Sequence, residues 1–155
     1  MASHLQSEIK QTKPFARRSD EALLSILRTA TVLEHGSNEL LRDYGITMTQ
    51  YNVLRILRGA GARGLCGRDI AERLISRVPD VSRLLDRMAE MGLLSKERDA
   101  ADRRHVTARI TPRGRRVLKQ ATPALEVFGR ARVESLSARS IEALVEALDT
   151  IREGV

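Results

Sequence analysis

The chain has 155 residues, a formal net charge of +7 and one cysteine. This length is enough for one domain with its own core, and a single cysteine excludes a disulfide framework. No stretch approaches the ~18 apolar residues of a membrane helix, and the N-terminus lacks the apolar segment of a secretion signal, so a soluble, cytoplasmic protein is expected. Aromatic residues make up only 3%, while Leu, Ala, Arg and Glu dominate, which favours helices.

The positive charge is concentrated in two segments. Residues 95–119 contain nine Lys and Arg against three Asp and Glu, and residues 55–66 contain three Arg and no acid. Residues 120–155 are net acidic. Such a concentration is typical of a surface that binds phosphates, and the alternative is a solvated basic helix start at residues 113–119.

The N-terminal third predicts an arm and a long helix. Residues 1–18 are polar, lack helical periodicity and contain Pro14, which indicates a flexible arm. Ser19 fits an N-cap, and the helix is expected to run to Gly45. Its apolar stripe consists of Leu23, Leu27, Ala30, Leu33, Leu40, Leu41 and Tyr44.

Two further helices are expected before the segment with the strongest pattern. Thr47 and Gln50 form a capping-box pattern for a mostly buried helix, which ends in a glycine-rich loop at residues 59–64. Residues 68–74 then read as a short helix, with three side chains facing inward: Ile70, Ala71 and Leu74.

The next helix has the clearest periodicity of the chain. Pro79 suits its first position and Gly92 suits a left-handed stop after its last turn. The preceding turn, residues 75–78, contains no Gly, and the position directly before Pro79 has no good capping side chain, so the helix start is defined only to within a residue or two. One face is apolar and is made of Val81, Leu84, Leu85, Met88 and Met91.

A charged two-stranded ribbon is expected after this helix. Residues 93–97 and 105–110 read as strands that can pair antiparallel, and residues 98–104 form the tip between them. A helix pair followed by such a ribbon is the pattern of a winged helix-turn-helix, whose second helix enters a DNA major groove.

The C-terminal part predicts two more helices. Thr111 and Pro112 form a capped start, Pro123 is expected to kink that helix, and Ser137 caps the last one. One domain cannot easily bury both the stripe of the first long helix and that of the last, which is made of Ile141, Leu144, Leu148 and Ile151. Exposed stripes at both chain ends therefore suggest a homodimer.

Several spaced motifs resemble one known family. The run VSRLLDRMAEMGLLSKERDAADRRHVTARITPRG, residues 81–114, is similar to the recognition helix and wing of the MarR family (multiple antibiotic resistance regulators), including Asp-Arg-Arg at 102–104 and Thr-x-x-Gly at 111–114. ITMTQYNVLRIL, residues 46–57, is similar to the family's preceding helix. The match runs from about residue 19 to the C-terminus.

The resemblance implies a mainly α fold with a small two-stranded β wing, a winged helix-turn-helix between N- and C-terminal dimerisation helices. It implies a flexible arm (1–18) and a single domain (19–155), in which 46–111 is the winged module and 19–45 and 112–155 are dimerisation helices. It also implies a homodimeric, sequence-specific DNA-binding regulator, a repressor of a pseudo-palindromic operator that is released by a small ligand. The alternatives are a non-specific architectural DNA-binding protein and a winged helix that docks a protein.

Candidate DNA contacts fall in two groups. For the recognition helix, direct readout is expected from Arg77, Pro79, Asp80, Ser82, Arg83 and Arg87, although Arg87 could instead pair with Asp86 or Glu90. For the wing, the resemblance places Arg104 in the minor groove, with Arg103 as a second candidate, and has Asp102 orient an arginine of the recognition helix. Phosphate contacts are expected from Arg98, Arg113, Arg115 and Arg116.

Other chemistry has little support in the sequence. No glycine-rich nucleotide loop, nucleophile motif or acid–base carboxylate pair is present, so an enzyme is not expected, and no cofactor or metal site is expected either. Cys66 permits a redox interpretation, but the peroxide-sensing branch of the family carries its cysteine near the N-terminus. Lys13, Arg17 and Arg18 could touch DNA or a partner subunit, although an unstructured tail is the simpler interpretation.

Overall fold

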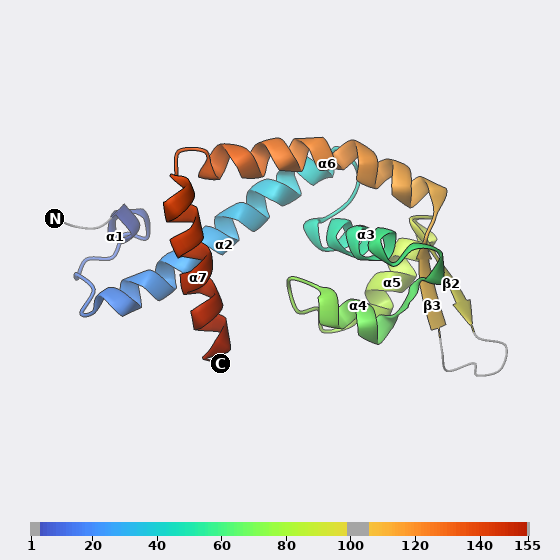
Figure 1. Cartoon of the computed structure of the whole chain (residues 1–155), viewed down its shortest axis with the longest axis horizontal. Coiled ribbons are helices and arrows are strands. Elements are labelled where there is room, and N and C mark those ends of the chain that lie inside the picture. The colour runs from blue at the N-terminus through green and yellow to red at the C-terminus, as the bar shows by residue number, and fades with distance from the viewer. Residues whose placement is uncertain (1–3, 99–105, 155) are drawn as a thin grey trace.

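The computed structural model describes residues 4–98 and 106–154 of the chain. Helices dominate it, and three short strands form one antiparallel sheet in the order β1-β3-β2 (Figure 1). The elements are α1 (His4–Glu8), α2 (Arg18–Arg42), α3 (Met48–Ala60), the 3-10 turn η1 (Gly61–Arg63), β1 (Leu65–Cys66), α4 (Gly67–Arg73), α5 (Val81–Glu90), β2 (Leu94–Arg98), β3 (Val106–Ile110), α6 (Pro112–Val133) and α7 (Ala138–Glu153).

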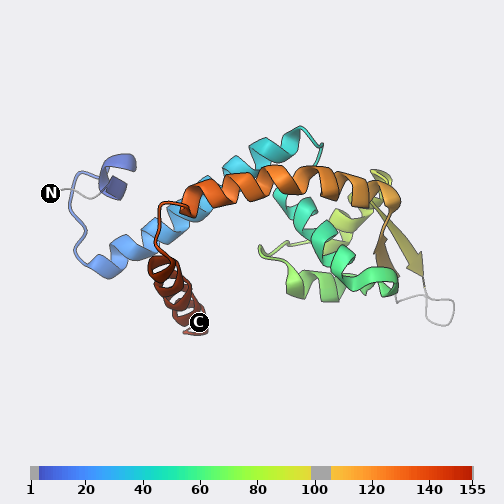
Figure 2. The same ribbon diagram turned by 45° about the horizontal axis from the view of Figure 1, so that its top comes forward.

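The two long helices connect two ends of an elongated molecule. α2 and α6 pack against each other and span most of its length (Figures 1 and 2). α3, α4, α5 and the sheet form a compact body at one end, whereas α1 and α7 lie at the other. None of the helices in the described ranges is long and apolar enough to cross a membrane.

The hydrophobic core belongs to the compact body. α3 contributes Tyr51 and Leu54, α5 contributes Met88, and α6 closes the core with Leu118. The Tyr51 hydroxyl and the Thr122 hydroxyl lie 3.0 Å apart, so the phenol of a buried ring keeps a polar partner. The first half of α6 therefore shares the core of the compact body.

Three helix starts have the predicted caps. The capping box of α3 is complete, because the Thr47 hydroxyl accepts from the Gln50 amide and the Gln50 side chain accepts from the Thr47 amide. Thr111 caps α6, and Ser137 caps α7 by accepting from the Ser140 amide at 3.1 Å. Gly92 has a φ of 71°, which confirms the predicted left-handed stop after α5.

The starts of α5 and α4 differ from the expectation. Asp80 is the N-cap of α5, with its carboxylate accepting from the Arg83 amide at 2.9 Å, so Pro79 precedes the helix and is not its first residue. The helix begins after Asp80 because the aspartate side chain accepts a hydrogen bond from an otherwise unpaired helix amide. A proline side chain cannot form this bond. In α4, Cys66 is the N-cap and Ala71 is exposed, not inward.

The sheet has a third strand that the sequence did not indicate. Leu65 pairs with Ala108 and Cys66 with Thr107, on the side of β3 opposite β2. Gly64 allows this close approach, since its φ is 67° and a Cβ there would lie 2.5 Å from the Ala108 carbonyl oxygen. A strand of two residues has no detectable alternation, so its pairing appears only in three dimensions.

The N-terminal segment is more ordered than the sequence suggested. α1 packs on α2, where Leu5 is buried and the Glu8 carboxylate pairs with Arg28 at 2.6 Å. A helix of five residues is too short to produce periodicity. α2 also begins earlier than expected, with Arg17 and not Ser19 at its N-cap.

The start of α6 is joined tightly to the end of α5. The Thr111 hydroxyl accepts from the Gly114 amide at 3.0 Å and donates to the Gly92 carbonyl at 2.6 Å. A Cβ at Gly114 would lie far inside contact distance of the Leu93 carbonyl oxygen and 3.0 Å from an Ile110 side-chain carbon. The Thr-x-x-Gly motif therefore serves this junction.

We expect Gly114→Ala to destabilise the fold by roughly 1–3 kcal/mol, because the methyl group forces the backbone of Leu93 to move. Gly129→Ala in the same helix is the matched control, since a Cβ there meets nothing within 4 Å and alanine favours helix by up to about 1 kcal/mol. Urea midpoints of the two variants measure the difference. Equal midpoints would show that the junction adapts to a side chain.

Candidate nucleic-acid interface

α5 presents one polar face to solvent. Ser82, Arg83 and Arg87 are exposed, whereas Leu85 and Met88 are buried in the core. This division follows from the helical period, since residues three and four apart share a face. The exposed face is continued by residues that precede the helix, namely Arg77, Pro79 and Asp80, all of them exposed.

The capping bond fixes the chemistry available at the α5 N-terminus. Asp80 directs one carboxylate oxygen at the Arg83 amide, which leaves the other oxygen for a donor from outside. Arg83 lies one turn further on. A hydrogen-bond acceptor and a guanidinium donor therefore stand next to each other at the exposed end of the helix.

The turn between α4 and α5 is held from behind by α3. The Asn52 side-chain oxygen accepts from the Ile75 amide at 3.1 Å, so the turn that carries Arg77 is anchored to the core helix. This contact was not evident from the sequence. Its only signal was a polar residue within a mostly apolar helix, which does not name a partner.

The ribbon lies beside α5 and runs antiparallel to it. Lys96 on β2 forms an ion pair with Asp86 in the middle of α5. Since Leu94 follows the C-terminal end of the helix closely, the strand leads back toward Asp80 and ends at the exposed Arg98. The N-terminal end of α5 and the tip end of the ribbon thus lie on the same side of the module.

The predicted wing residues are only partly described. Arg98 is exposed at the end of β2, where it pairs with Val106 in the ladder. Asp102, Arg103 and Arg104 lie outside the described residues.

The recognition-helix arginines are available for contacts with a ligand. Among the described residues, neither Arg83 nor Arg87 has an ion-pair partner, and Asp86 is used by Lys96. Arg109 differs, because it donates to the Ala62 carbonyl at 2.8 Å and pairs with Glu97. Arg109 therefore holds the sheet to η1, although it belongs to the most basic segment of the sequence.

This arrangement is suited to DNA. A protruding helix with exposed Arg, Ser and Asp side chains at its N-terminal end fits a major groove, where Arg can donate to guanine, Asp can accept from cytosine and Ser can do either. A ribbon ending beside it reaches the neighbouring backbone or minor groove.

Comparisons with known proteins agree with this geometry. Residues 46–106 match the sequence profile of the MarR family. The chain is 30% identical over 101 residues to the transcriptional regulator HosA of Escherichia coli O157:H7, a match that covers 65% of this chain and 73% of HosA.

Solved structures are similar over nearly the whole chain. Sco5413, a MarR family transcriptional regulator from Streptomyces coelicolor, is 26% identical with a TM-score of 0.75, covering 88% of this chain and 94% of its own. Sco3205 from the same organism, solved in complex with DNA, is 25% identical with a TM-score of 0.79, covering 93% and 92%. The chain therefore belongs to the MarR family of DNA-binding transcriptional regulators.

Proposed function

We propose that the protein is a homodimeric regulator that reads a pseudo-palindromic operator, represses transcription when bound, and is released by a small ligand. The observation that carries the proposal is the exposed polar face of α5, together with the apolar surface at the opposite end of the molecule. The first binds DNA and the second binds another copy of the chain.

Sequence readout is assigned to the N-terminal end of α5 and the turn before it. Arg83 and Arg77 donate to base edges or phosphates, and Ser82 and Asp80 contact neighbouring positions. Arg87, one turn further along, extends the contact. Pro79 contributes an apolar contact, which suits a thymine methyl group.

The wing supplies the second part of the interface. By resemblance, Arg104 enters the minor groove, with Arg103 as the second candidate, and Asp102 orients an arginine of the recognition helix. Arg98 contacts phosphate. A narrow A·T-rich minor groove has a deepened negative potential, which favours an arginine there.

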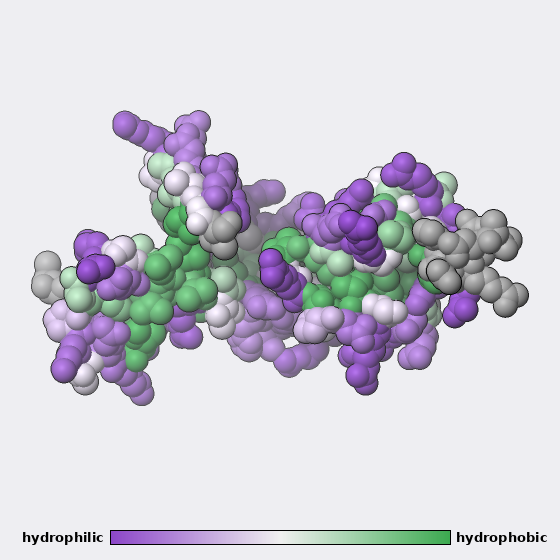
Figure 3. Space-filling view, turned by 90° about the horizontal axis from the view of Figure 1, so that it is seen from below, coloured by the Kyte–Doolittle hydropathy of each residue, from purple (hydrophilic) through white to green (hydrophobic). Residues whose placement is uncertain are grey.

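The second copy is expected to cover the apolar surface of α2 and α7. Leu27 is 63% exposed, and α7 has no buried residue. Figure 3 shows an apolar area on this half of the molecule, and further apolar residues on the same face of the compact body. The large exposed apolar residues of these two helices are Leu23, Leu24, Leu27, Val32, Leu33, Ile141, Leu144, Val145 and Ile151. Two-fold pairing would place two α5 helices about 10 base pairs apart, in successive major grooves.

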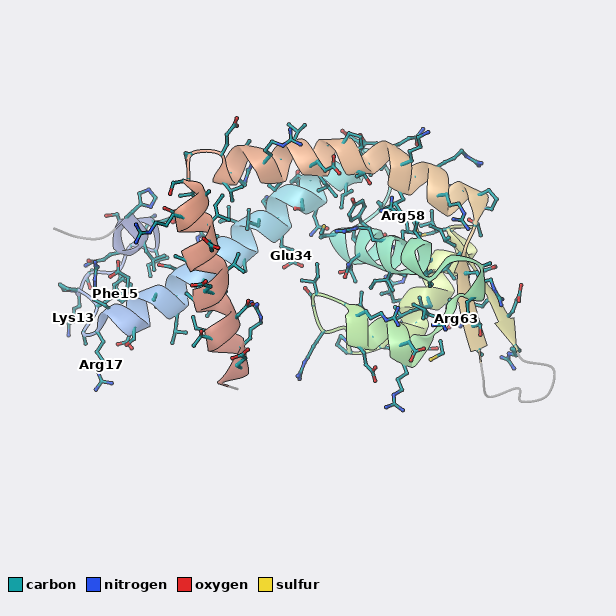
Figure 4. The ribbon with its side chains drawn as sticks, in the orientation of Figure 1. Lys13, Phe15, Arg17, Glu34, Arg58 and Arg63 are labelled. Atoms are coloured by element: carbon teal, nitrogen blue, oxygen red, sulfur yellow. The ribbon has the colours of Figure 1, made fainter. Side chains whose placement is uncertain are left out.

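The basic N-terminal segment lies on the dimer side of the molecule. Lys13, Phe15 and Arg17 follow α1 at the end far from the sheet (Figure 4). Within one subunit they are remote from α5. Contact with the partner subunit is therefore a better proposal for them than contact with the operator half-site read by their own chain.

A ligand site is proposed between α2, α3 and α6. A cavity of about 490 Å³ there has an apolar wall with Leu33, Tyr51 and Phe128. Its charged lining consists of two arginines, Arg55 and Arg58, and one acid, Glu126, so its net charge is positive. Arg58 projects from α3 on the side that faces α6 (Figure 4). An apolar ligand with an anionic group would match both parts.

A neighbouring cavity connects the proposed ligand site to the turn before α5. It measures about 270 Å³ and lies between α2 and the turn before α5, with Ile75 and Ser76 in its wall. It shares Leu33 and Met48 with the larger cavity. A ligand that binds more tightly when the α5 helices are wrongly spaced for DNA would shift the dimer to that state and release the operator.

Arg83→Ala should weaken operator binding by ~1–3 kcal/mol and reduce the preference over a scrambled duplex, because a base contact is lost. Arg104→Ala should weaken operator binding as well, and Arg130→Ala, at an exposed position of α6, is the control. Fluorescence anisotropy against the DNA flanking the protein's own gene, at several salt concentrations, measures these effects. Equal binding of the native protein to the flanking DNA and to the scrambled duplex would favour an architectural protein. Absence of binding at every salt concentration would favour a protein-docking module.

Asp80→Ala should destabilise the fold by ~0.5–2 kcal/mol through loss of the cap, whereas Asp80→Asn keeps a capping oxygen and most of the stability. The asparagine variant should still discriminate less among operator sequences, because its amide half donates where the carboxylate accepts. Urea unfolding and operator anisotropy separate the two effects. Unchanged operator selectivity in Asp80→Asn would restrict Asp80 to the cap.

Leu27→Glu should weaken the dimer at least ~tenfold, because two charges would be buried in the interface, one from each subunit. Sedimentation velocity at micromolar concentration measures the change. Gln120→Glu, at an exposed polar position of α6, introduces the same charge as a control. A native protein that sediments as a monomer would refute the dimer.

A further inference from the structure

The first two turns of α6 carry an exposed basic surface. It consists of Arg113, Arg115, Arg116 and Lys119, and is called here the α6 shoulder. The sequence predicted phosphate contacts for its three arginines, but the operator contacts proposed above, at the N-terminal end of α5 and in the wing, do not include them. Within residues 4–98 and 106–154, none of these four side chains has an ion-pair or hydrogen-bond partner. The rest of the chain beyond it, residues 120–155, is net acidic.

The stability of α6 does not explain these cations. A helix N-terminus carries partial positive charge from its unpaired amides, so acidic side chains suit it and basic ones are unfavourable. The first turn of α6 has no acid, and the shoulder residues lie three and four positions apart, where like charges repel. An anion bound at the shoulder would relieve both effects.

The shoulder is remote from the DNA-reading end of the module. In the ribbon, Leu94 pairs with Ile110 at the base and Arg98 pairs with Val106 near the tip, which separates the two ends by roughly 14 Å at ~3.4 Å per residue. Thr111 holds the start of α6 at the base, beside Gly92 and the C-terminal end of α5 (Figure 1). We therefore expect a straight duplex that contacts the N-terminal end of α5 and the far end of the ribbon to leave the shoulder without a contact.

We propose that the α6 shoulder is a second DNA contact, which binds backbone phosphates beyond the operator half-site without reading sequence. The proposal rests on the operator-binding face proposed above. Three of the four cations are arginines, whose planar guanidinium groups donate two parallel hydrogen bonds to phosphate oxygens. The phosphates come either from flanking DNA that bends toward the shoulder or from a second duplex.

The test compares two variants that each remove two exposed positive charges. Arg115→Gln with Arg116→Gln alters the shoulder, and Arg130→Gln with Arg139→Gln is the matched control on α6 and α7. Each full-length dimer is titrated by anisotropy with a duplex limited to the operator and with one carrying long flanks. Capture of a labelled duplex by a second, immobilised duplex measures bridging.

The shoulder variant should bind the short operator like the native protein. With long flanks, its log–log salt slope should fall by up to ~1.8 per subunit, which corresponds to two phosphate contacts at ~0.9 each. If the second duplex is the source, bridging should drop at least several-fold while both anisotropy titrations stay unchanged. The control variant should match the native protein in all three measurements.

Two results would overturn the proposal. Equal weakening on the short and long duplexes would assign the shoulder to the operator interface, and native behaviour in all three measurements would leave it without a DNA role. A native protein that does not distinguish operator from scrambled DNA would instead refute the sequence-specific function. The shoulder test would still be valid in that case, because phosphate contacts do not depend on sequence.

Discussion

The hydroxyl of Thr111 makes the contact on which the geometry of the DNA-binding module depends. It donates to the carbonyl of Gly92, where the recognition helix has just ended, and accepts from the amide of Gly114 in the first turn of α6. The Thr111 amide donates to Leu93 at the base of the ribbon. One residue thus joins α5, the ribbon and the long helix that leads to the other end of the molecule.

That junction explains why one helix belongs to two parts of the protein. Leu118 and Ala121 of α6 are fully buried in the winged module, whereas Val127 and Val133 further along are exposed. Gly36 of α2 accommodates the Phe128 ring so closely that a Cβ there would lie 2.5 Å from it. Packed side chains therefore connect α2 and the far half of α6 to the winged module, which is the continuous path that the proposed response to a ligand requires.

The sequence predicted the elements whose signals are local. The capping box at Thr47, the cap at Ser137 and the amphipathic stripe of α5 were each readable within a few residues, and each is present. Strand β1 was missed because its two residues are specified by the approach of Gly64 to Ala108, more than forty positions away. The contacts that hold the candidate site could not be predicted for the same reason. Asn52 meets Ile75, and Lys96 meets Asp86, only after the chain has folded.

The basic residues show most clearly that a local pattern in the sequence does not give the arrangement in space. The excess of basic residues between positions 95 and 119 resembled one phosphate-binding face, yet the ribbon reverses the chain and separates the basic residues that the structure describes there. Lys96 and Arg109 are paired with acids inside the module, Arg98 is exposed at the far end of β2, and Arg113, Arg115 and Arg116 follow the base of the ribbon. In a β-ribbon, residues that are neighbours in sequence can lie on different surfaces. A basic segment is therefore evidence for one anion-binding surface only after each of its residues has been assigned to an end of the ribbon.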